Sequence, residues 1–386
     1  MKIRVPYYFK DFKCVAWECS DTCGAGWEII IDDKSFNKYK KVKGDFGKQL
    51  NSKITFYEDN EPGFILDNKN CPFLNKNLLC DIYSNLGEDH LCHTCKTFPR
   101  IIEEYGSLRE ICLSLSCPEA ARLILKDHRK VSFETSENDE FVTTYNSISP
   151  ELYLHIIKCR KIAFDLLQNE DIDFNKRLAL LLKFSSDIQE IIDLCELSQI
   201  ATVRKNYLDS NFINNLIDSF DNYNNKQDIK YNIMHKYMNV FENLEEINEI
   251  WPKIIANAIN VFYTKNNLEF YETSHTKFKE YYKNKLYEYE NLIVYFINRY
   301  FMRCLLDADL LSKIKLGIMS LLIIKDLNVV SWLDNNYNFD LKDQIEISHM
   351  YSKEVEHSDN NIEKLHQLFN ENPMYDLDTM ISLIMN

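Results

Sequence analysis

Apolar residues recur every three or four positions through most of the chain beyond residue 119, which is the spacing of one face of an α-helix. Residues 152–166 and 292–303 show this spacing. A serine, a proline and a glutamate at 149–151 supply a cap, a first-turn proline and an acidic residue. Asparagine and proline at 372–373 open a last short helix in the same way. The pattern predicts a long helical region.

Glycine and proline, which break helices, are scarce in that region. One of the eight glycines and three of the eight prolines lie beyond residue 119. The polar, acidic run at 132–140 is the best linker candidate before the helices. We therefore expect two domains, a cysteine-rich module at 1–130 and an all-helical domain at 131–386.

The N-terminal part has a mixed pattern. Short runs with β-branched or aromatic residues at 27–31, 64–66 and 81–83 predict strands. A helix is expected to start at Pro118, directly after Cys117. The expected fold class is mainly α: a small cysteine-rich α+β N-terminal metal module followed by a large all-helical domain.

Composition is that of an ordinary soluble globular protein, with 45% apolar and 27% charged residues among 386. The formal charge of −14 gives no electrostatic attraction to a phosphate backbone, so we expect no nucleic-acid partner. The N-terminus has no apolar signal region, and apolar runs such as 321–324 fall far short of a membrane span. The expected location is the cytoplasm, where thiols stay reduced.

Cysteine is concentrated at one end of the chain. Three of the twelve, Cys159, Cys195 and Cys304, are isolated in the helical region and are expected to act as small apolar residues. The other nine lie in the first 117 residues: Cys14, Cys19, Cys23, Cys71, Cys80, Cys92, Cys95, Cys112 and Cys117. In a reduced compartment such a cluster indicates metal binding in place of disulfides.

The spacing favours an iron–sulfur cluster over zinc. Structural zinc sites use two paired knuckles, and Cys92–Cys95 is the one Cys-x2-Cys pair. Cubane clusters also take four cysteines but accept irregular spacing. His90 and His93 are possible zinc ligands, so zinc stays open as the alternative.

Familiar catalytic motifs are absent. The Gly24-Ala25-Gly26 sequence precedes a predicted strand and has no third glycine, so it does not match a dinucleotide loop. There is no Walker A sequence, no G-x-S-x-G elbow and no H-E-x-x-H. The residues alone therefore indicate a metal module and a helical domain without indicating a reaction.

Three blocks resemble a known family. They are FKCVAWECSDTCGAGWEIIID at 12–32, CPFLNKNLLCDIYSNLGEDHLCHTCKTFPR at 71–100 and LSLSCPEAARLIL at 113–125. Together they resemble the flagellin lysine-N-methylase family. The second block is also similar to the YkgJ-like family of cysteine-rich zinc or iron–sulfur proteins. Beyond residue 125 the resemblance is weak and is found mainly at 290–300.

The resemblance implies a function and a ligand set. The protein would be a protein-lysine N-methyltransferase that uses S-adenosylmethionine on flagellin, aided by an iron–sulfur cluster of the 4Fe-4S type. A cysteine that usually follows Cys23 is replaced here by Gly24. The resemblance singles out no catalytic or donor-binding residue. The metal-ligating cysteines that match the family are Cys14, Cys19, Cys23, Cys71, Cys80, Cys95 and Cys117.

A second interpretation comes from another functional class. The cysteine module is shared with metal-binding proteins, and no donor-binding motif is visible in the chain. The alternative is therefore a cysteine-rich zinc or iron–sulfur protein, a redox carrier or adaptor, without methyl transfer. Neither interpretation involves a membrane.

Overall fold

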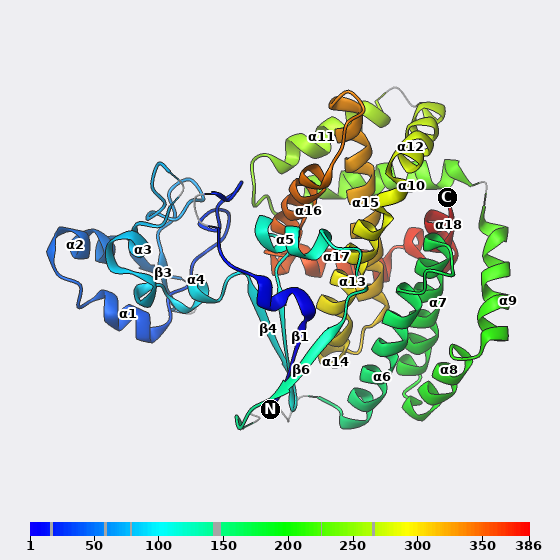
Figure 1. Ribbon diagram of the computed structural model, residues 1–386, viewed down its shortest axis with the longest axis horizontal. Helices are drawn as coiled ribbons and strands as arrows, with labels where there is room; N and C mark the ends of the chain where they lie inside the picture. The colour runs from blue at the N-terminus through cyan, green and yellow to red at the C-terminus, as the bar shows by residue number, and fades with distance from the viewer. Residues whose placement is uncertain (16–17, 58–59, 78, 142–147, 225, 265–266) are drawn as a thin grey trace.

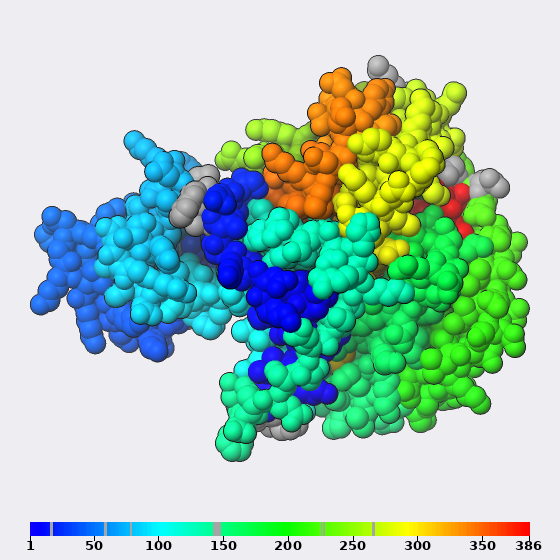
Figure 2. Space-filling model, in the orientation of Figure 1, coloured from blue at the N-terminus to red at the C-terminus, as the bar shows by residue number. Residues whose placement is uncertain are grey.

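The computed structural model shows a small lobe that projects from a larger helical body (Figure 1). The fold is mainly α, as the sequence predicts. The N-terminal segment runs along the junction between the lobe and the body (Figure 2). The structure describes residues 1–15, 18–57, 60–77, 79–141, 148–224, 226–264 and 267–386.

A four-stranded sheet lies beside the junction, in the order β4-β5-β1-β6. β1 pairs in parallel with β5 and antiparallel with β6, while β4 and β5 are an antiparallel pair. The strands are β1 (Lys2–Pro6), β4 (Arg100–Tyr105), β5 (Leu108–Leu113) and β6 (Phe133–Glu137).

The linker expected at 132–140 is wrong, because β6 lies within it and pairs with β1 from Phe133 to Glu137. β6 is an edge strand whose side chains are nearly all exposed, so its sequence carries no apolar alternation. Backbone pairing with β1 holds it in the sheet, together with Phe133, whose ring packs against Phe164 and beneath Arg4. Burial patterns therefore cannot reveal such a strand from sequence.

The lobe has its own small hydrophobic core, which includes Ile29, Tyr39, Phe64 and Phe73. Its elements are α1 (Asp33–Tyr39), α2 (Gly44–Ser52), β2 (Ile54–Phe56), β3 (Pro62–Phe64), α3 (Asp81–Leu86) and α4 (His93–Thr97).

The strand predictions in the lobe are mostly wrong. Residues 27–31 form one isolated bridge, between Ile30 and Gly63, and no strand. Residues 81–83 begin helix α3, and the expected strand at 64–66 overlaps only the end of β3. Short apolar runs fit a strand and a buried helical turn equally well, so tertiary packing decides between them.

The body contains long helices, and two predicted starts are confirmed. The Ser149 side chain caps α6, and α5 begins at Pro118. The helices are α5 (Pro118–Leu125), α6 (Pro150–Leu167), α7 (Phe174–Asp193), α8 (Ile200–Asn206), α9 (Ser210–Phe220), α10 (Gln227–Val240), α11 (Trp251–Phe262), α12 (Leu268–Tyr282), α13 (Leu286–Tyr300), α14 (Cys304–Asp307), α15 (Leu311–Asp334), α16 (Leu341–Val355), α17 (Asp359–Glu371) and α18 (Leu377–Met385).

Short 3₁₀ helices extend or connect these elements. The asparagine and proline at 372–373 start such a helix, and Asp376 then caps the last α-helix. The 3₁₀ helices are η1 (Tyr7–Asp11), η3 (Glu88–His90), η5 (Leu197–Gln199), η6 (Asp221–Tyr223), η7 (Phe241–Asn243), η8 (Lys283–Lys285), η9 (Phe301–Arg303) and η10 (Pro373–Tyr375).

Hydrophobic burial does not follow the chain order. Tyr8, Tyr105 and Leu113 lie in the same core as the body helices, whereas the second core lies between residues 29 and 95. The sheet and α5 thus pack with the body, and the lobe is inserted between β1 and β4. The domains expected at 1–130 and 131–386 stay a prediction about folding units.

Helix α15 is the centre of the body. It packs against α7, α13, α16 and α17, and nearly all of its side chains are buried. Within the described ranges it is the one helix long and apolar enough to cross a membrane, and 83% of its most apolar window is buried inside the protein. A helix at the centre of a core is apolar all round because all of its faces pack against other helices.

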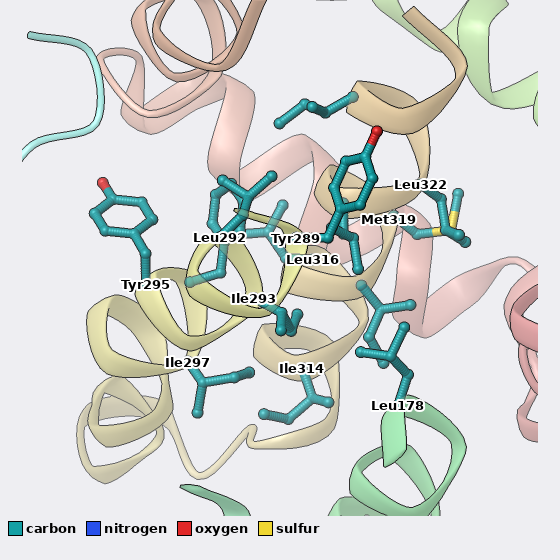
Figure 3. Packing of buried hydrophobic residues seen from close by; sticks show 14 of the residues in the cluster. Leu178, Tyr289, Leu292, Ile293, Tyr295, Ile297, Ile314, Leu316, Met319 and Leu322 are labelled. Carbon is teal, nitrogen blue, oxygen red and sulfur yellow. The ribbon is translucent and has the colours of Figure 1, made fainter. Parts of the chain in front are cut away.

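Gly317 lets α13 and α15 approach closely. A Cβ atom at this position would lie 3.1 Å from Phe296 Cβ and 3.6 Å from the Cδ1 atoms of Ile293 and Ile297. Figure 3 shows this packing, with Ile293 and Ile297 of α13 beside Ile314 of α15.

We predict that Gly317→Leu destabilises the protein by about 1–3 kcal/mol, because the added side chain has no space between the helices. Gly317→Ala is the matched control. Its higher helix propensity, worth about 1 kcal/mol, offsets the tight contact, so its stability stays close to that of the parent. Urea unfolding measures the stability of both variants. Equal stability of the two would contradict the close approach of α13 and α15 at Gly317.

Candidate functional site

Four predicted cysteines come together where the lobe meets α5. Charge on Cys14 and Cys19 influences the Cys23 thiol, which places the three sulfurs near one another. The charges of the Cys19 and Cys23 thiols also act on the Cys117 thiol. We name Cys14, Cys19, Cys23 and Cys117 the first thiol group. It joins cysteines that are about a hundred positions apart in the sequence.

A second thiol group lies inside the lobe. The Cys92 and Cys95 side chains are hydrogen bonded to each other. Cys71 and Cys80 influence the Cys95 thiol and also each other. The second thiol group therefore consists of Cys71, Cys80, Cys92 and Cys95. It includes Cys92, which the family resemblance leaves out.

Cys112 lies in neither group. It is buried in β5, where its charged neighbours are Arg299, Glu103 and Glu356. His90 also has other contacts, since its Nδ1 atom lies 2.8 Å from the Leu86 carbonyl oxygen.

Backbone N–H groups point at several of the sulfurs. Cys80 and Cys117 precede α3 and α5, and each thiol accepts hydrogen bonds from two N–H groups of the following turn. Such bonds stabilise a thiolate and tune a bound metal or cluster. Burial raises the pKa of the Cys71 and Cys117 thiols to about 12, so a metal would displace their protons on binding.

The donor set fits a metal by its chemistry. Zinc and cubane clusters each take four thiolates, and the chain has two sets of four thiols that influence one another electrostatically. Within the described residues, however, no group of three or more His, Cys, Asp or Glu side chains has converged into a metal-binding geometry. The metal, its identity and its ligands therefore stay predictions.

The two thiol groups lie back to back. The Cys71 N–H donates a hydrogen bond to the Gly24 carbonyl oxygen at 2.6 Å, and Cys80 lies within the electrostatic reach of Cys23. Position 24, where the family usually has a cysteine, thus directly faces Cys71.

Helix α16 presents a polar end to the first thiol group. The Lys353 ammonium donates to the Asp21 carboxylate at 2.5 Å and to the Thr22 carbonyl oxygen at 3.3 Å. His357, just beyond the helix, stacks on Trp27 with the ring centres 4.4 Å apart. α16 thus contacts the loop that carries Cys19 and Cys23.

His357 also contacts the segment that carries Cys117, the fourth member of the first thiol group. Its Nε2 atom lies 2.5 Å from the Ser116 hydroxyl, one residue before Cys117. Burial lowers the pKa of His357 to about 4, and the Lys353 charge acts in the same direction. The imidazole is therefore neutral at neutral pH.

A half-buried carboxylate lies next to this histidine. Glu356 accepts hydrogen bonds from Tyr300 at 2.9 Å, Tyr295 at 3.1 Å and Ser352 at 2.5 Å. Burial raises the pKa of Glu356 above its usual value. A buried carboxylate without a bound cation can hold a proton more easily than one in water.

Another carboxylate lies deeper in the body. The Asp326 carboxylate of α15 accepts hydrogen bonds from Tyr263 and Tyr271, and His275 Nε2 lies 3.3 Å away. Burial raises the pKa of Asp326 to about 6. Tyrosines and acids in the helical region thus form several polar clusters, and the Glu356 cluster lies next to His357 in the chain.

The sequence did not single out these helical residues. Lys353 lies in α16, where a charged side chain usually points to solvent, and His357 lies just beyond the end of the helix. The signal for Cys92 was present in the Cys-x2-Cys pair. Parts of the resemblance blocks, residues 16–17 and 78, lie outside the described residues.

Comparison with known proteins gives a consistent result. Residues 160–383 match the family model of the FliB lysine N-methylase C-terminal domain. The chain is 33% identical over 134 residues to the flagellar biosynthetic protein FliU of Salmonella muenchen, across 32% of this chain and 78% of that protein.

Two lysine-N-methylases, from Salmonella choleraesuis and Salmonella typhimurium, are each 29% identical over 154 residues. These matches span 38% of this chain and only 37% of the length of each methylase. No solved structure matches the chain.

Position 24 offers a test of how the thiol groups face each other. A Cβ atom there would lie 3.5 Å from Cys71 Cβ and 3.4 Å from Leu74 Cδ1, so a side chain fits. Disulfides span Cβ separations of about 3.5–4.5 Å. We predict that Gly24→Cys forms a disulfide with Cys71 when the metal-free protein is mildly oxidised, detected by peptide mass mapping. Gly44→Cys, at a position facing open space, is the control.

Because burial lowers the pKa of His357, we predict that the stability of the protein depends on pH. That pKa falls from 6.5 in the unfolded chain to about 4 in the folded one, so the unfolded chain binds the proton more readily between these values. Stability is then complete above about pH 6.5 and falls as the pH drops toward 4, by at most about 3 kcal/mol. His357→Gln should reduce this loss in urea unfolding at pH 7 and pH 5. The exposed His93→Gln serves as control, and an identical effect of both would contradict the burial argument.

Proposed function

The chain belongs to the FliB lysine N-methylase family, and from that premise we propose that it transfers methyl groups from S-adenosylmethionine to lysine side chains of flagellin. The methylase names of two relatives support the reaction, and the flagellar name of the third supports the substrate. The reaction forms an N–CH₃ bond and breaks the S–CH₃ bond of the sulfonium, whose positive charge passes to the amine.

One observation carries the proposal for the place of reaction. Lys353 contacts the loop between Cys19 and Cys23, and His357 contacts Ser116 beside Cys117. Both residues lie inside the segment that matches the methylase family. A thiol-rich loop and a methylase helix thus share one junction. Neither part alone would distinguish a methylase from a metal carrier.

We propose that the thiols hold an iron–sulfur cluster of the 4Fe-4S type, with zinc as the alternative. One proposed set consists of the predicted ligands Cys14, Cys19, Cys23 and Cys117. The other would combine the predicted ligands Cys71, Cys80 and Cys95 with Cys92. The electrostatic influence of these thiols on one another supports both sets. If only three thiols of a set ligated it, a bound cluster would have one iron free to take the amino and carboxylate groups of the donor.

The chain must also provide a neutral amine. The free lysine side chain has a pKa near 10.4 and attacks only after losing a proton. Burial at a dry junction favours the neutral amine, and a neighbouring carboxylate can accept the proton. Glu356 lies at the junction with hydroxyl groups of Tyr295 and Tyr300 around it, so it is the candidate acceptor.

The proposed setting is the cytoplasm, where thiols stay reduced and newly made flagellin is present. The formal charge of −14 fits a basic, lysine-bearing protein segment as partner and disfavours nucleic acid. The alternative function, a metal-binding redox carrier or adaptor without methyl transfer, rests on the lobe having a hydrophobic core of its own.

The test starts with anaerobic purification and analysis of iron, sulfide and zinc. We expect stoichiometric iron and sulfide, together with transfer of labelled methyl from S-adenosylmethionine to flagellin lysines. Cys23→Ser and Cys80→Ser should each lose metal, because both thiols lie among the predicted ligands. Cys112→Ser is the matched control and should keep its metal, since Cys112 lies outside both thiol groups.

The outcomes separate the proposals. Bound iron without methyl transfer to flagellin would favour the metal carrier. Bound zinc would refute the iron–sulfur cluster, and the methyl-transfer assay would then decide whether the protein is a methylase. Equal metal loss in Cys112→Ser would contradict the assignment of the thiol groups.

A further inference from the structure

Lys353 is a buried lysine whose charge meets the thiol loop. Its side chain is 2% exposed. Its ammonium donates to Asp21 and to the Thr22 carbonyl oxygen, both of which lie between Cys19 and Cys23. The same ammonium lies 5.8 Å from the Trp27 ring centre. These contacts with the lobe all lie in one loop, between Asp21 and Trp27.

The loop backbone is shaped to approach α16 closely. Gly26 has a positive φ of 99°, which disfavours other residues. A Cβ atom there would lie 2.9 Å from Ile247 Cγ2 and 3.5 Å from Lys353 Cε. The glycine therefore serves contact with the body as well as the turn itself.

Two lysines form ion pairs between the lobe and the body among the described residues. The Lys69–Glu246 pair, at 3.3 Å, is about half exposed on both sides and contributes little. The Lys353–Asp21 pair differs because Lys353 is buried. An ammonium buried without a partner costs several kcal/mol, so displacing the loop would leave Lys353 uncompensated.

We propose that Lys353 is a positioning residue that fixes the Cys19–Cys23 loop against α16 and thereby assembles the first thiol group with Cys117. The significance of those thiols as a metal site rests on the proposed function, but the positioning itself does not. Loop and helix are coupled in both directions: a metal bound by the thiols would steady α16, and a disturbed α16 would loosen the metal.

The test uses the metal-free full-length protein, so it needs neither cluster nor methyl donor. Each thiol is alkylated with iodoacetamide, and the rate at each cysteine is read by peptide mass spectrometry. In Lys353→Met we expect alkylation of half-buried Cys19 and buried Cys117 to be about tenfold faster or more, as the loop opens. Cys80 in the second thiol group should keep its rate.

Three further variants make the result specific. Lys353→Arg keeps the charge and should restore most of the protection. Asp21→Asn removes the carboxylate that pairs with Lys353. Because Asp21 is more exposed than Lys353, this variant tests the same contact with less risk to folding. Lys69→Met breaks the other junction pair and should leave Cys19 and Cys117 unchanged. Circular dichroism and thermal unfolding establish that each variant is folded.

A second readout measures metal affinity. Loss of a contact that supports ligands typically weakens metal binding by about 10- to 100-fold. We expect this in Lys353→Met and Asp21→Asn at the first thiol group, with recovery in Lys353→Arg.

Two results would overturn the proposal: unchanged alkylation of Cys19 and Cys117 in folded Lys353→Met and Asp21→Asn, or the same increase in Lys69→Met. Faster alkylation in a protein that shows no methyl transfer would leave the positioning role intact and refute the proposed function alone.

Discussion

Buried charge at the end of α16 is the constraint around which the junction is arranged. The helix carries Lys353 and Glu354 into the interior and Glu356 follows at its end, and each meets a partner from a different segment. Glu354 accepts hydrogen bonds from the Ile247 and Asn248 N–H groups, while Lys353 binds Asp21. Because an unpaired buried charge is costly, these partners must stay in place together. One helix end therefore sets the positions of the thiol loop, the 247–248 segment and the tyrosines of α13.

The chain path makes this arrangement possible. β1 enters the sheet of the body first, the lobe then extends outward, and β4, β5 and α5 return to the same core. The lobe is consequently held at both of its ends by the body. Cys14 follows β1 and η1 at the start of the insertion, and Cys117 precedes α5 after its end. The first thiol group therefore joins the two ends of the insertion. The second group stays within the lobe.

This difference gives the two groups different consequences. The first combines thiols from both ends of the insertion, and the loop that carries Cys19 and Cys23 contacts α16, so a metal bound there would be coupled to the body. The second combines a close Cys92–Cys95 pair with Cys71 and Cys80 beside the small core of the lobe, so it would mainly stabilise the lobe. A small core of this size gains much from a metal crosslink.

The sequence by itself determined the helical body, because apolar period and capping residues such as Ser149 act locally. It also identified the cysteine cluster, since composition needs no geometry. It misjudged 81–83 and the exposed strand β6, where side-chain patterns carry no signal. Tertiary structure alone decided how the thiols divide, that Cys117 joins Cys19 and Cys23, and that Lys353 faces inward. Spacing along a chain measures contour length, whereas the contacts of Cys117 and Lys353 with the loop at 19–23 depend on packing between segments about a hundred or more than three hundred residues apart.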